Sequence, residues 1–177
     1  VTAAGLVNTM EEEDLRMLIR DMGEEPQAAK VARAIVRART EADISRTRHL
    51  ADVVEQALGG RRGRIHPATR TFQAIRIGVN GELDALPAGI TKSLQLLRIG
   101  GRMAVISFHS LEDRIAKTRF QRHAGRWISL QAGGQKWDGD LPQVKLVNRK
   151  PVVASDEEVN RNPRARSAKL RVVERIS

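Results

Sequence analysis

A short stretch with the sequence SFHSLED holds the side chains best suited to chemistry, and it follows an apolar run at Met103–Ile106. His109 lies between Ser107 and Ser110, and an imidazole can activate a neighbouring hydroxyl or hold a proton during a reaction. The stretch therefore suggests nucleophilic or general acid–base catalysis. A simple helix start is the competing interpretation of the same residues.

The second half of this stretch has the pattern of a helix cap. Ser110 and Asp113 have the S-x-x-D spacing of a capping box, and carboxylates in a first turn complement the positive end of the helix dipole. Capping therefore accounts for Glu112 and Asp113. It also argues against a phosphate bound at this helix start, because two carboxylates would repel it.

Capping leaves Ser107, Phe108 and His109 unexplained, and these three residues directly follow a predicted strand. In open α/β sheets, ligands bind just outside the carboxyl ends of the strands. We therefore treat Ser107 and His109 as candidate catalytic residues, while a single histidine in such a place can also be structural.

Other chemistries lack their sequence signals. The G-x-S-x-G elbow of a Ser-His-Asp hydrolase is absent, and the only histidine after His109 is His123. Neither a G-x-x-x-x-G-K-[ST] phosphate loop nor an H-E-x-x-H metal pair occurs. With four scattered histidines and no cysteine, we expect no metal site and no disulfide.

The first third of the chain predicts a small helical domain, because apolar residues recur at helical spacing between start and stop signals. The expected helices run from a T-x-x-E start at Thr9 to Gly23, from Pro26 onward, and from about Thr47 to Leu58. We assign residues 1–58 to this domain and the glycine- and arginine-rich residues 59–65 to a linker.

Residues 66–177 predict part of an α/β domain. The expected elements are a long helix from His66, a helix at about Pro87–Leu97, a strand at Arg102–Ser107, a helix from Ser110, and strands at Val144–Asn148 and Ala168–Ile176. An apolar strand between two helices is typical of a parallel sheet covered on both faces, yet the sequence offers it no parallel neighbour. The last two strands are spaced like a closing antiparallel pair, so we expect the C-terminal portion of an α/β domain whose first strands are absent.

Residues 121–143 show no sustained periodicity and predict a long loop. This segment holds Trp127 and Trp137, whose rings could pin the loop or stack on a nucleic-acid base. We favour pinning.

Positive charge is concentrated in two segments of a chain with 31 Lys and Arg against 21 Asp and Glu, a net charge of +10. Residues 57–81 contain no acid and five arginines, namely Arg61, Arg62, Arg64, Arg70 and Arg76. Residues 160–177 contain six basic residues and one acid, and the run NPRARSAKLR lies within them. Such clusters indicate a polyanionic partner, and we interpret the run as an RNA-facing rim; a charged edge strand is the alternative.

No apolar stretch approaches the roughly 20 residues of a membrane helix, so we expect no membrane association. The chain begins at Val1 rather than Met and shows no signal-peptide pattern, which suggests that sequence is missing upstream.

Four segments together make the chain resemble the MraW/RsmH-type methyltransferases. They are GEEPQAAKVARAIVRAR from Gly23, HPATRTFQAIRIGVNGEL from His66, GGRMAVISFHSLEDRI from Gly100 and NPRARSAKLR from Asn162. The resemblance covers most of the chain in an unbroken order and is weak mainly at residues 121–145.

This resemblance implies methylation of the N4 amine of a cytidine in small-subunit ribosomal RNA, with S-adenosylmethionine as cofactor. It implies a Rossmann-like class I methyltransferase domain, of the α/β class, interrupted by a helical domain that helps to hold the RNA. The family's cofactor loop would lie upstream, so we expect no cofactor-binding residue in this chain and no activity from the chain alone. The implied partner is small-subunit ribosomal RNA or the small subunit, and a homodimer is left open. The implied compartment is the bacterial cytoplasm, or a mitochondrion or plastid in a eukaryote.

Within that mechanism, Ser107 or His109 could face a cytosine turned out of its stack. The side chains that could hold the flanking phosphates are Arg70, Arg76, Arg164 and Arg166. A non-catalytic, basic RNA-binding or ribosome-assembly module is the alternative function.

Overall fold

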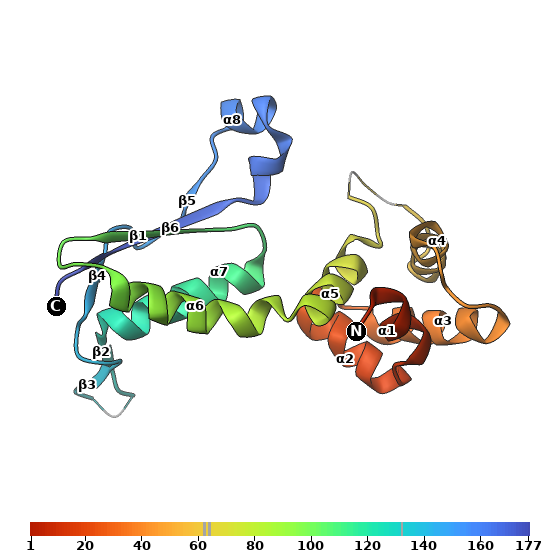
Figure 1. The fold of residues 1–177 in the computed structure, drawn as a ribbon, viewed down its shortest axis with the longest axis horizontal. Coiled ribbons are helices and arrows are strands. Elements are labelled where there is room, and N and C mark those ends of the chain that lie inside the picture. The colour runs from red at the N-terminus through yellow and green to blue at the C-terminus, as the bar shows by residue number, and fades with distance from the viewer. Residues whose placement is uncertain (62, 64, 132) are drawn as a thin grey trace. The chain divides into compact units, whose positions relative to one another are not determined.

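The computed structural model describes residues 1–61, 63, 65–131 and 133–177 and divides into two compact units, Val1–Glu82 and Leu83–Ser177 (Figure 1). The boundary falls after Glu82 rather than at residues 59–65, because the helix that follows the predicted linker packs within the first unit. Two linker residues, Arg62 and Arg64, lie outside the described residues.

The first unit is helical. Its helices are α1 (Ala3–Thr9), α2 (Glu12–Gly23), α3 (Ala28–Glu41), α4 (Thr47–Ala57) and α5 (Thr69–Asn80). The predicted helices over α2, α3 and α4 are confirmed, but the predicted start at Thr9 is wrong. Thr9 ends α1, which the sequence did not predict, and its hydroxyl donates to the carbonyl of Gly5 at 2.8 Å instead of capping α2. The N-cap of α2 is Glu11.

The backbones of α2 and α5 approach each other closely at Gly23. A Cβ atom at Gly23 would lie 2.6 Å from the carbonyl oxygen of Arg70, so a larger residue would force the helices apart. Beside this contact, the side-chain amide of Gln73 donates to the carbonyl of Met22 at 3.0 Å. The buried core around the contact includes Leu15, Ile19, Val31, Ile35, Val54 and Ala74. These contacts explain why α5 belongs to the helical unit.

The second unit combines helices and strands. Its elements are α6 (Glu82–Leu96, its first residue at the unit boundary), β1 (Arg102–Ser107), α7 (Ser110–Ala124), β2 (Arg126–Ser129), β3 (Gln135–Asp138), β4 (Val144–Leu146), β5 (Val152–Val153), α8 (Asp156–Arg161), a 3-10 helix (Pro163–Ser167) and β6 (Lys169–Arg175). The predicted strands at β1, β4 and β6 and the predicted helix at α7 are confirmed. Among the residues that the structure describes, no helix has the length and apolar composition needed to cross a bilayer.

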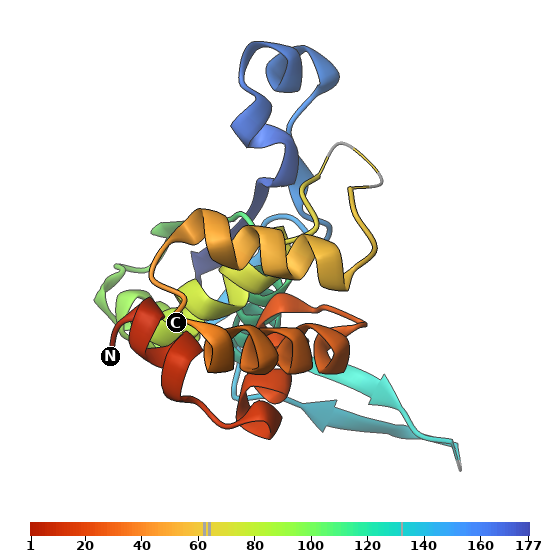
Figure 2. The ribbon, with the colours of Figure 1, turned by 90° about the vertical axis from the view of Figure 1, so that its right-hand side faces the viewer.

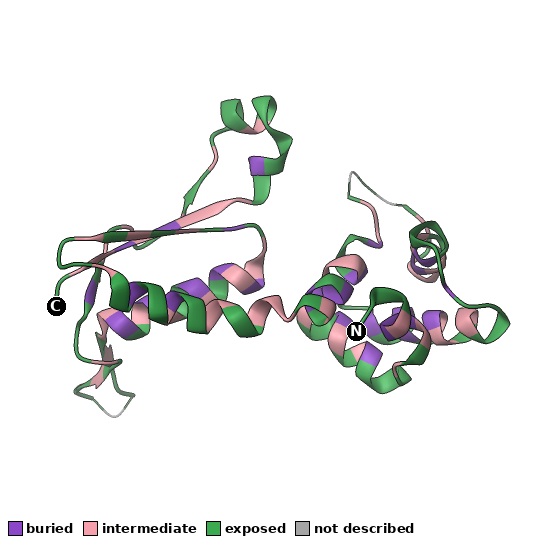
Figure 3. Ribbon diagram, viewed as in Figure 1, coloured by how far each residue is buried: buried purple, intermediate pink, exposed green. Residues whose placement is uncertain are grey.

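Every strand pair of the main sheet is antiparallel: β6 pairs with β1 on one side and with β4 and β5 on the other. The closing antiparallel pair β4–β6 is therefore confirmed. Among the described strands β1 has no parallel neighbour, as the sequence predicted, and α6 and α7 lie along one face of the sheet rather than on both faces (Figure 3). Ile106, on the other face, is 59% exposed.

Charged side chains tie this unit together. Glu174 in β6 accepts from Arg102 of β1 at 2.9 Å and from Lys145 of β4 at 2.6 Å. Hydrogen bonds from Lys145 and Arg102 hold the pKa of Glu174 below its ordinary value. The guanidinium of Arg175 donates to three carbonyls at the end of α6, those of Leu94, Gln95 and Leu97, at 3.3, 2.7 and 2.6 Å. A cation at this place complements the negative end of the helix dipole.

Candidate active site and nucleic-acid interface

The end of β1 and the start of α7 bring the two predicted catalytic residues to one turn. β1 ends at Ser107, Phe108 and His109 form the turn, and α7 begins at Ser110. Ser107 is 3% exposed, and its hydroxyl donates to the carbonyl of Lys169, its partner in β6, at 3.4 Å. The hydroxyl of Ser107 is therefore bound to the sheet.

His109 is the N-cap of α7. Its Nδ1 accepts from the backbone N–H of Glu112 at 3.3 Å, and the carboxylate of Glu112 returns to accept from the N–H groups of His109 at 3.3 Å and Phe108 at 2.9 Å. The predicted capping box over Ser110 and Asp113 is therefore wrong by one residue. The ring nitrogen of His109 takes the part expected of the serine hydroxyl.

This cap fixes the tautomer of His109. Because Nδ1 accepts a hydrogen bond, the neutral ring carries its proton on Nε2. Nε2 is buried and lies 3.2 Å from Oε1 of Glu112, but it makes no hydrogen bond of acceptable geometry with any described residue. Buried donors are rarely left without a partner, so this N–H is a polar group of the turn that lacks a well-formed hydrogen bond.

Phe108 is the exposed member of the turn. Its side chain is on the surface, with 56% of the residue exposed, while its backbone N–H is held by Glu112. An exposed aromatic ring next to a histidine with an unused donor is suited to contacting a planar, polar ring such as a nucleobase.

Asp113 joins α7 to β6 rather than capping the helix. Arg171 donates to it twice, at 2.6 and 3.1 Å, and Lys169 lies 3.6 Å away. The hydrogen bonds from Arg171 hold the pKa of Asp113 below its ordinary value. Arg171 is 7% exposed, so its predicted place on an RNA-facing rim is wrong.

The inward position of Arg171 could have been found from the strand period. Side chains two residues apart in a strand share a face, and Val173, two residues from Arg171, is fully buried. An arginine on that face needs a buried carboxylate, and Asp113 supplies it.

The helix start at this turn does not fit the carboxylate of a methionine cofactor. The carboxylate of Glu112 accepts from the N–H groups of Phe108 and His109, directly before α7, and Nδ1 of His109 accepts from the N–H of Glu112 in the first turn, so a second anion would meet a carboxylate here.

The four arginines predicted to contact RNA differ in their partners. Arg70 lies 3.6 Å from the buried carboxylate of Glu25, and Arg76 is bound by Glu82 at 2.9 Å. Arg164 and Arg166, by contrast, are exposed and form no ion pair with any described residue. They lie in residues 149–168, the C-terminal arm, which carries β5, α8 and the 3-10 helix and stands apart from α6 and α7 (Figure 1). Two other arginines of the first cluster, Arg62 and Arg64, are not among the described residues.

Net charge is divided unequally between the two units. Val1–Glu82 contains 13 Lys and Arg against 12 Asp and Glu, a net charge of +1. Leu83–Ser177 contains 18 against 9, a net charge of +9. The second unit should therefore attract a polyanion more strongly than the first. The five arginines of residues 57–81 do not change this, because acidic residues elsewhere in the first unit nearly balance them.

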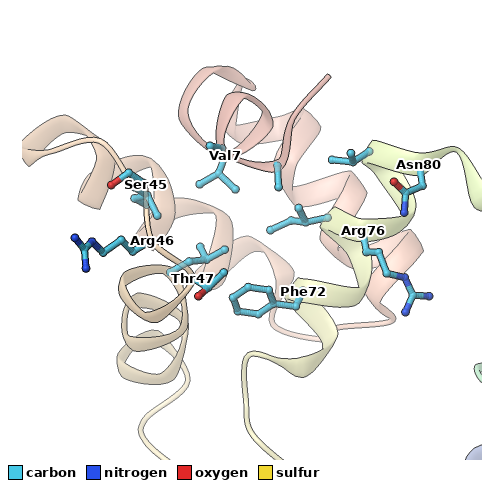
Figure 4. A pocket seen from close by; sticks show the side chains of 13 residues that line it. Val7, Ser45, Arg46, Thr47, Phe72, Arg76 and Asn80 are labelled. Atoms are coloured by element: carbon cyan, nitrogen blue, oxygen red, sulfur yellow. The ribbon is translucent and has the colours of Figure 1, made fainter.

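The helical unit instead contains an apolar hollow of about 420 Å³ between α1, α4 and α5 (Figure 4). Val7, Thr47 and Phe72 face it, and the guanidinium groups of Arg46 and Arg76 extend away from it on opposite sides. Its described lining has neither a histidine nor a carboxylate, so we do not regard it as a catalytic site.

Comparisons with known proteins agree with the resemblance seen in the sequence. The model of the MraW methylase family matches residues 1–176. The chain is similar to proteins called ribosomal RNA small subunit methyltransferase H, being 51% identical to that of Geotalea daltonii, 49% to that of Geobacter sulfurreducens and 48% to that of Thermomicrobium roseum. Each match covers 99% of this chain but only 57%, 57% and 54% of the relative, so the chain spans about half the length of these proteins. The α/β architecture is consistent with a Rossmann-like class I methyltransferase, and the chain belongs to the MraW methylase family.

Proposed function

We propose that this protein takes part in methylation of the N4 amine of a cytidine in small-subunit ribosomal RNA, with S-adenosylmethionine as the methyl donor. The observation that carries the proposal is the turn after β1, where Phe108 is exposed and His109 has an unused donor, in a chain of the MraW methylase family. The names of the relatives, ribosomal RNA small subunit methyltransferase H, support the class of substrate.

The reaction explains why the turn needs these groups. The lone pair of N4 is delocalised into the cytosine ring, so the base must leave its stack and be held in line with the incoming methyl group. The methyl donor would supply the methyl group and keep the electron pair of its broken sulfur–methyl bond, and N4 would release one proton to solvent. The Nε2–H of His109 could donate to an acceptor on the cytosine ring, and Phe108 could stack on that ring.

The other predicted residues have supporting parts in this proposal. Ser107, bound to β6, would keep the end of the strand and the turn in place. Arg164 and Arg166 on the C-terminal arm would bind phosphates beside the target, with Arg70 and Arg76 contributing less because they already face carboxylates. In an enzyme of the relatives' length, the methyl donor would be bound outside the turn described here.

Two substitutions at His109 separate a site residue from a helix cap. Asparagine at an N-cap supplies an acceptor as well as any residue does, so His109→Asn keeps the cap and removes the Nε2–H, whereas His109→Ala removes both. In an enzyme of the relatives' length, we expect both variants to lower kcat/KM at least about tenfold, and only His109→Ala to lower the melting temperature. The product is measured as N4-methylcytidine by mass spectrometry of digested ribosomal RNA. A fully active His109→Asn enzyme would show that His109 only caps α7, and a product methylated elsewhere would overturn the proposed reaction.

A non-catalytic RNA-binding module is the second candidate. It is favoured by the structural bonds that Ser107 and the Nδ1 atom of His109 already make. In that case RNA would bind, and no labelled methyl group would reach it in the presence of S-adenosylmethionine.

A further inference from the structure

The hairpin β2–β3 separates its two tryptophans into different environments. Trp137 is a fixed side chain: its indole N–H donates to the carbonyl of Asp140 at 3.3 Å, and its ring lies so close to Gly125 that a Cβ atom would not fit there. The segment is anchored at its base, where the N–H of Asp140 donates to the carbonyl of Arg122 at the end of α7. Trp137 therefore pins the segment, as the sequence analysis expected of both tryptophans.

Trp127 is different, because most of it is in solvent. It is 64% exposed, and its described ring contact is with Trp137, edge to face, with centroids 5.4 Å apart and planes at 74°. Trp127 and Trp137 are directly opposite each other in the ladder, so they share one face of the hairpin. The contacts of Trp137 suffice to pin the segment, so the exposed ring of Trp127 has no role in the fold that these contacts explain.

The surroundings of Trp127 favour a nucleic acid over a protein. Ser129 and Gln135 share its face and offer hydrogen-bonding groups without charge. Lys136 and Arg126 lie on the opposite face, and Lys136 has no ion-pair partner among the described residues. The hairpin also belongs to the unit that holds 18 Lys and Arg against 9 Asp and Glu. Figure 2 shows β2 and β3 side by side as a narrow ribbon, and Trp127 in β2 is largely exposed.

We propose that Trp127 is a stacking platform for an unpaired base of the RNA substrate, at a place separate from the turn after β1. An exposed aromatic ring binds single-stranded nucleic acid with little sequence preference, because every base has a π-face, and the cations on the other face of the hairpin add a general attraction for phosphates. The inference rests on the proposed function in that the RNA is the substrate. Trp127 would position this RNA rather than take part in the reaction.

The test uses the 177-residue chain and its own fluorescence, without any methyl donor. Trp137→Phe leaves Trp127 as the only reporter, and Trp127→Phe leaves Trp137 as the matched control. Titration with a short single-stranded RNA should quench the fluorescence of Trp127 and leave that of Trp137 nearly unchanged. The duplex of the same sequence should quench neither, because its bases are already stacked.

A second measurement avoids any loosening of the hairpin by Trp137→Phe. Trp127→Ala, in the otherwise unchanged chain, should weaken binding of the labelled single strand about tenfold and leave binding of the duplex unchanged. Unchanged single-strand affinity, or a Trp127 signal that stays constant when RNA binding is saturated, would overturn the proposal. So would a signal that responds only to ribosomal proteins. A different result would count against the proposed reaction alone: single-stranded RNA quenches Trp127, but the unsubstituted enzyme of the relatives' length transfers no methyl group to that RNA.

Discussion

The two units of this chain use charge in opposite ways. The helical unit is nearly neutral, with 13 basic and 12 acidic residues, and apolar packing holds it together where α2 and α5 meet at Gly23. The second unit is strongly cationic, yet two of its cations are used within the fold: Arg171 is buried against Asp113, and Arg175 binds carbonyls at the end of α6. A surplus of arginine is therefore not the same as an RNA-binding surface.

The difference in charge between the two units changes which arginines are expected to bind RNA phosphates. Arg70 and Arg76, in the neutral unit, face Glu25 and Glu82, so their charge is partly cancelled before any partner arrives. Arg164 and Arg166 are exposed on the C-terminal arm of the cationic unit. The comparison predicts that the helical unit is sensitive to changes in packing and that the second unit is sensitive to loss of ion pairs.

The largest effect should come from Asp113→Ala. Removing one member of a buried ion pair leaves the other charge uncompensated, which costs about 3–5 kcal/mol in the free energy of unfolding. The matched control is Asp138→Ala, which breaks an exposed pair with Arg126 and should cost about 1 kcal/mol or less. Urea unfolding followed by tryptophan fluorescence reports the second unit, because Trp127 and Trp137 both lie in it. Equal losses for the two variants would refute an internal role for the Arg171–Asp113 pair.

The same pair should make stability depend on pH in one direction. Arg171 lowers the pKa of Asp113 in the folded state, so the unfolded chain takes up this proton first as the pH falls. The contribution of Asp113 is complete above the ordinary aspartate pKa of about 4 and is lost as the pH falls below it toward the folded-state value. Asp113→Ala should therefore show a shallower loss of stability with acid than the unchanged chain.

A smaller effect is expected from Gly23→Ala in the helical unit. The new methyl group would meet the carbonyl oxygen of Arg70 at 2.6 Å, and overpacking of this kind costs about 1–3 kcal/mol. Gly89→Ala in α6 is the control, because a Cβ there meets open space and should be neutral or stabilising by up to about 1 kcal/mol. On heating, Gly23→Ala should lose part of its helical circular dichroism at a temperature where tryptophan fluorescence, which reports the second unit, is still unchanged. A simultaneous change of both signals would mean that the units do not unfold separately.

The sequence predicted those parts of the fold that depend on local pattern. The 3.6-residue period located α2, α3 and α4, and the apolar run gave β1 its observed bounds, Arg102–Ser107. The long helix expected from His66 begins at Thr69 and ends at Asn80, because Gly81 takes a left-handed conformation, with φ at 60°, and α6 follows. Apolar periodicity continues across such a break and does not reveal it.

The candidate site was predicted in place but not in its contacts. The turn lies directly after β1, where the sequence placed it, and its role as a ligand site stays a prediction that rests on its place at a strand end. Its cap was assigned to Ser110, as serine is the commoner N-cap, whereas His109 holds that position. The partner of Asp113 lies 58 residues away in β6, and nothing near Asp113 in sequence identifies it. A contact between residues so far apart in the sequence depends on the register of β6 against β1, and the sequence did not predict that register.

The smallest effect is expected from pairs of arginine substitutions, and it bears most directly on the difference between the units. Arg164→Gln with Arg166→Gln should reduce the slope of log affinity against log salt by about 2, because each lost phosphate contact removes about one released counterion. Arg70→Gln with Arg76→Gln should change that slope much less, since both side chains already face carboxylates. Filter binding of single-stranded RNA at several salt concentrations measures both slopes, and melting curves check that each variant is folded. A larger change from the helical pair would assign the phosphate contacts to the neutral unit and reverse the comparison.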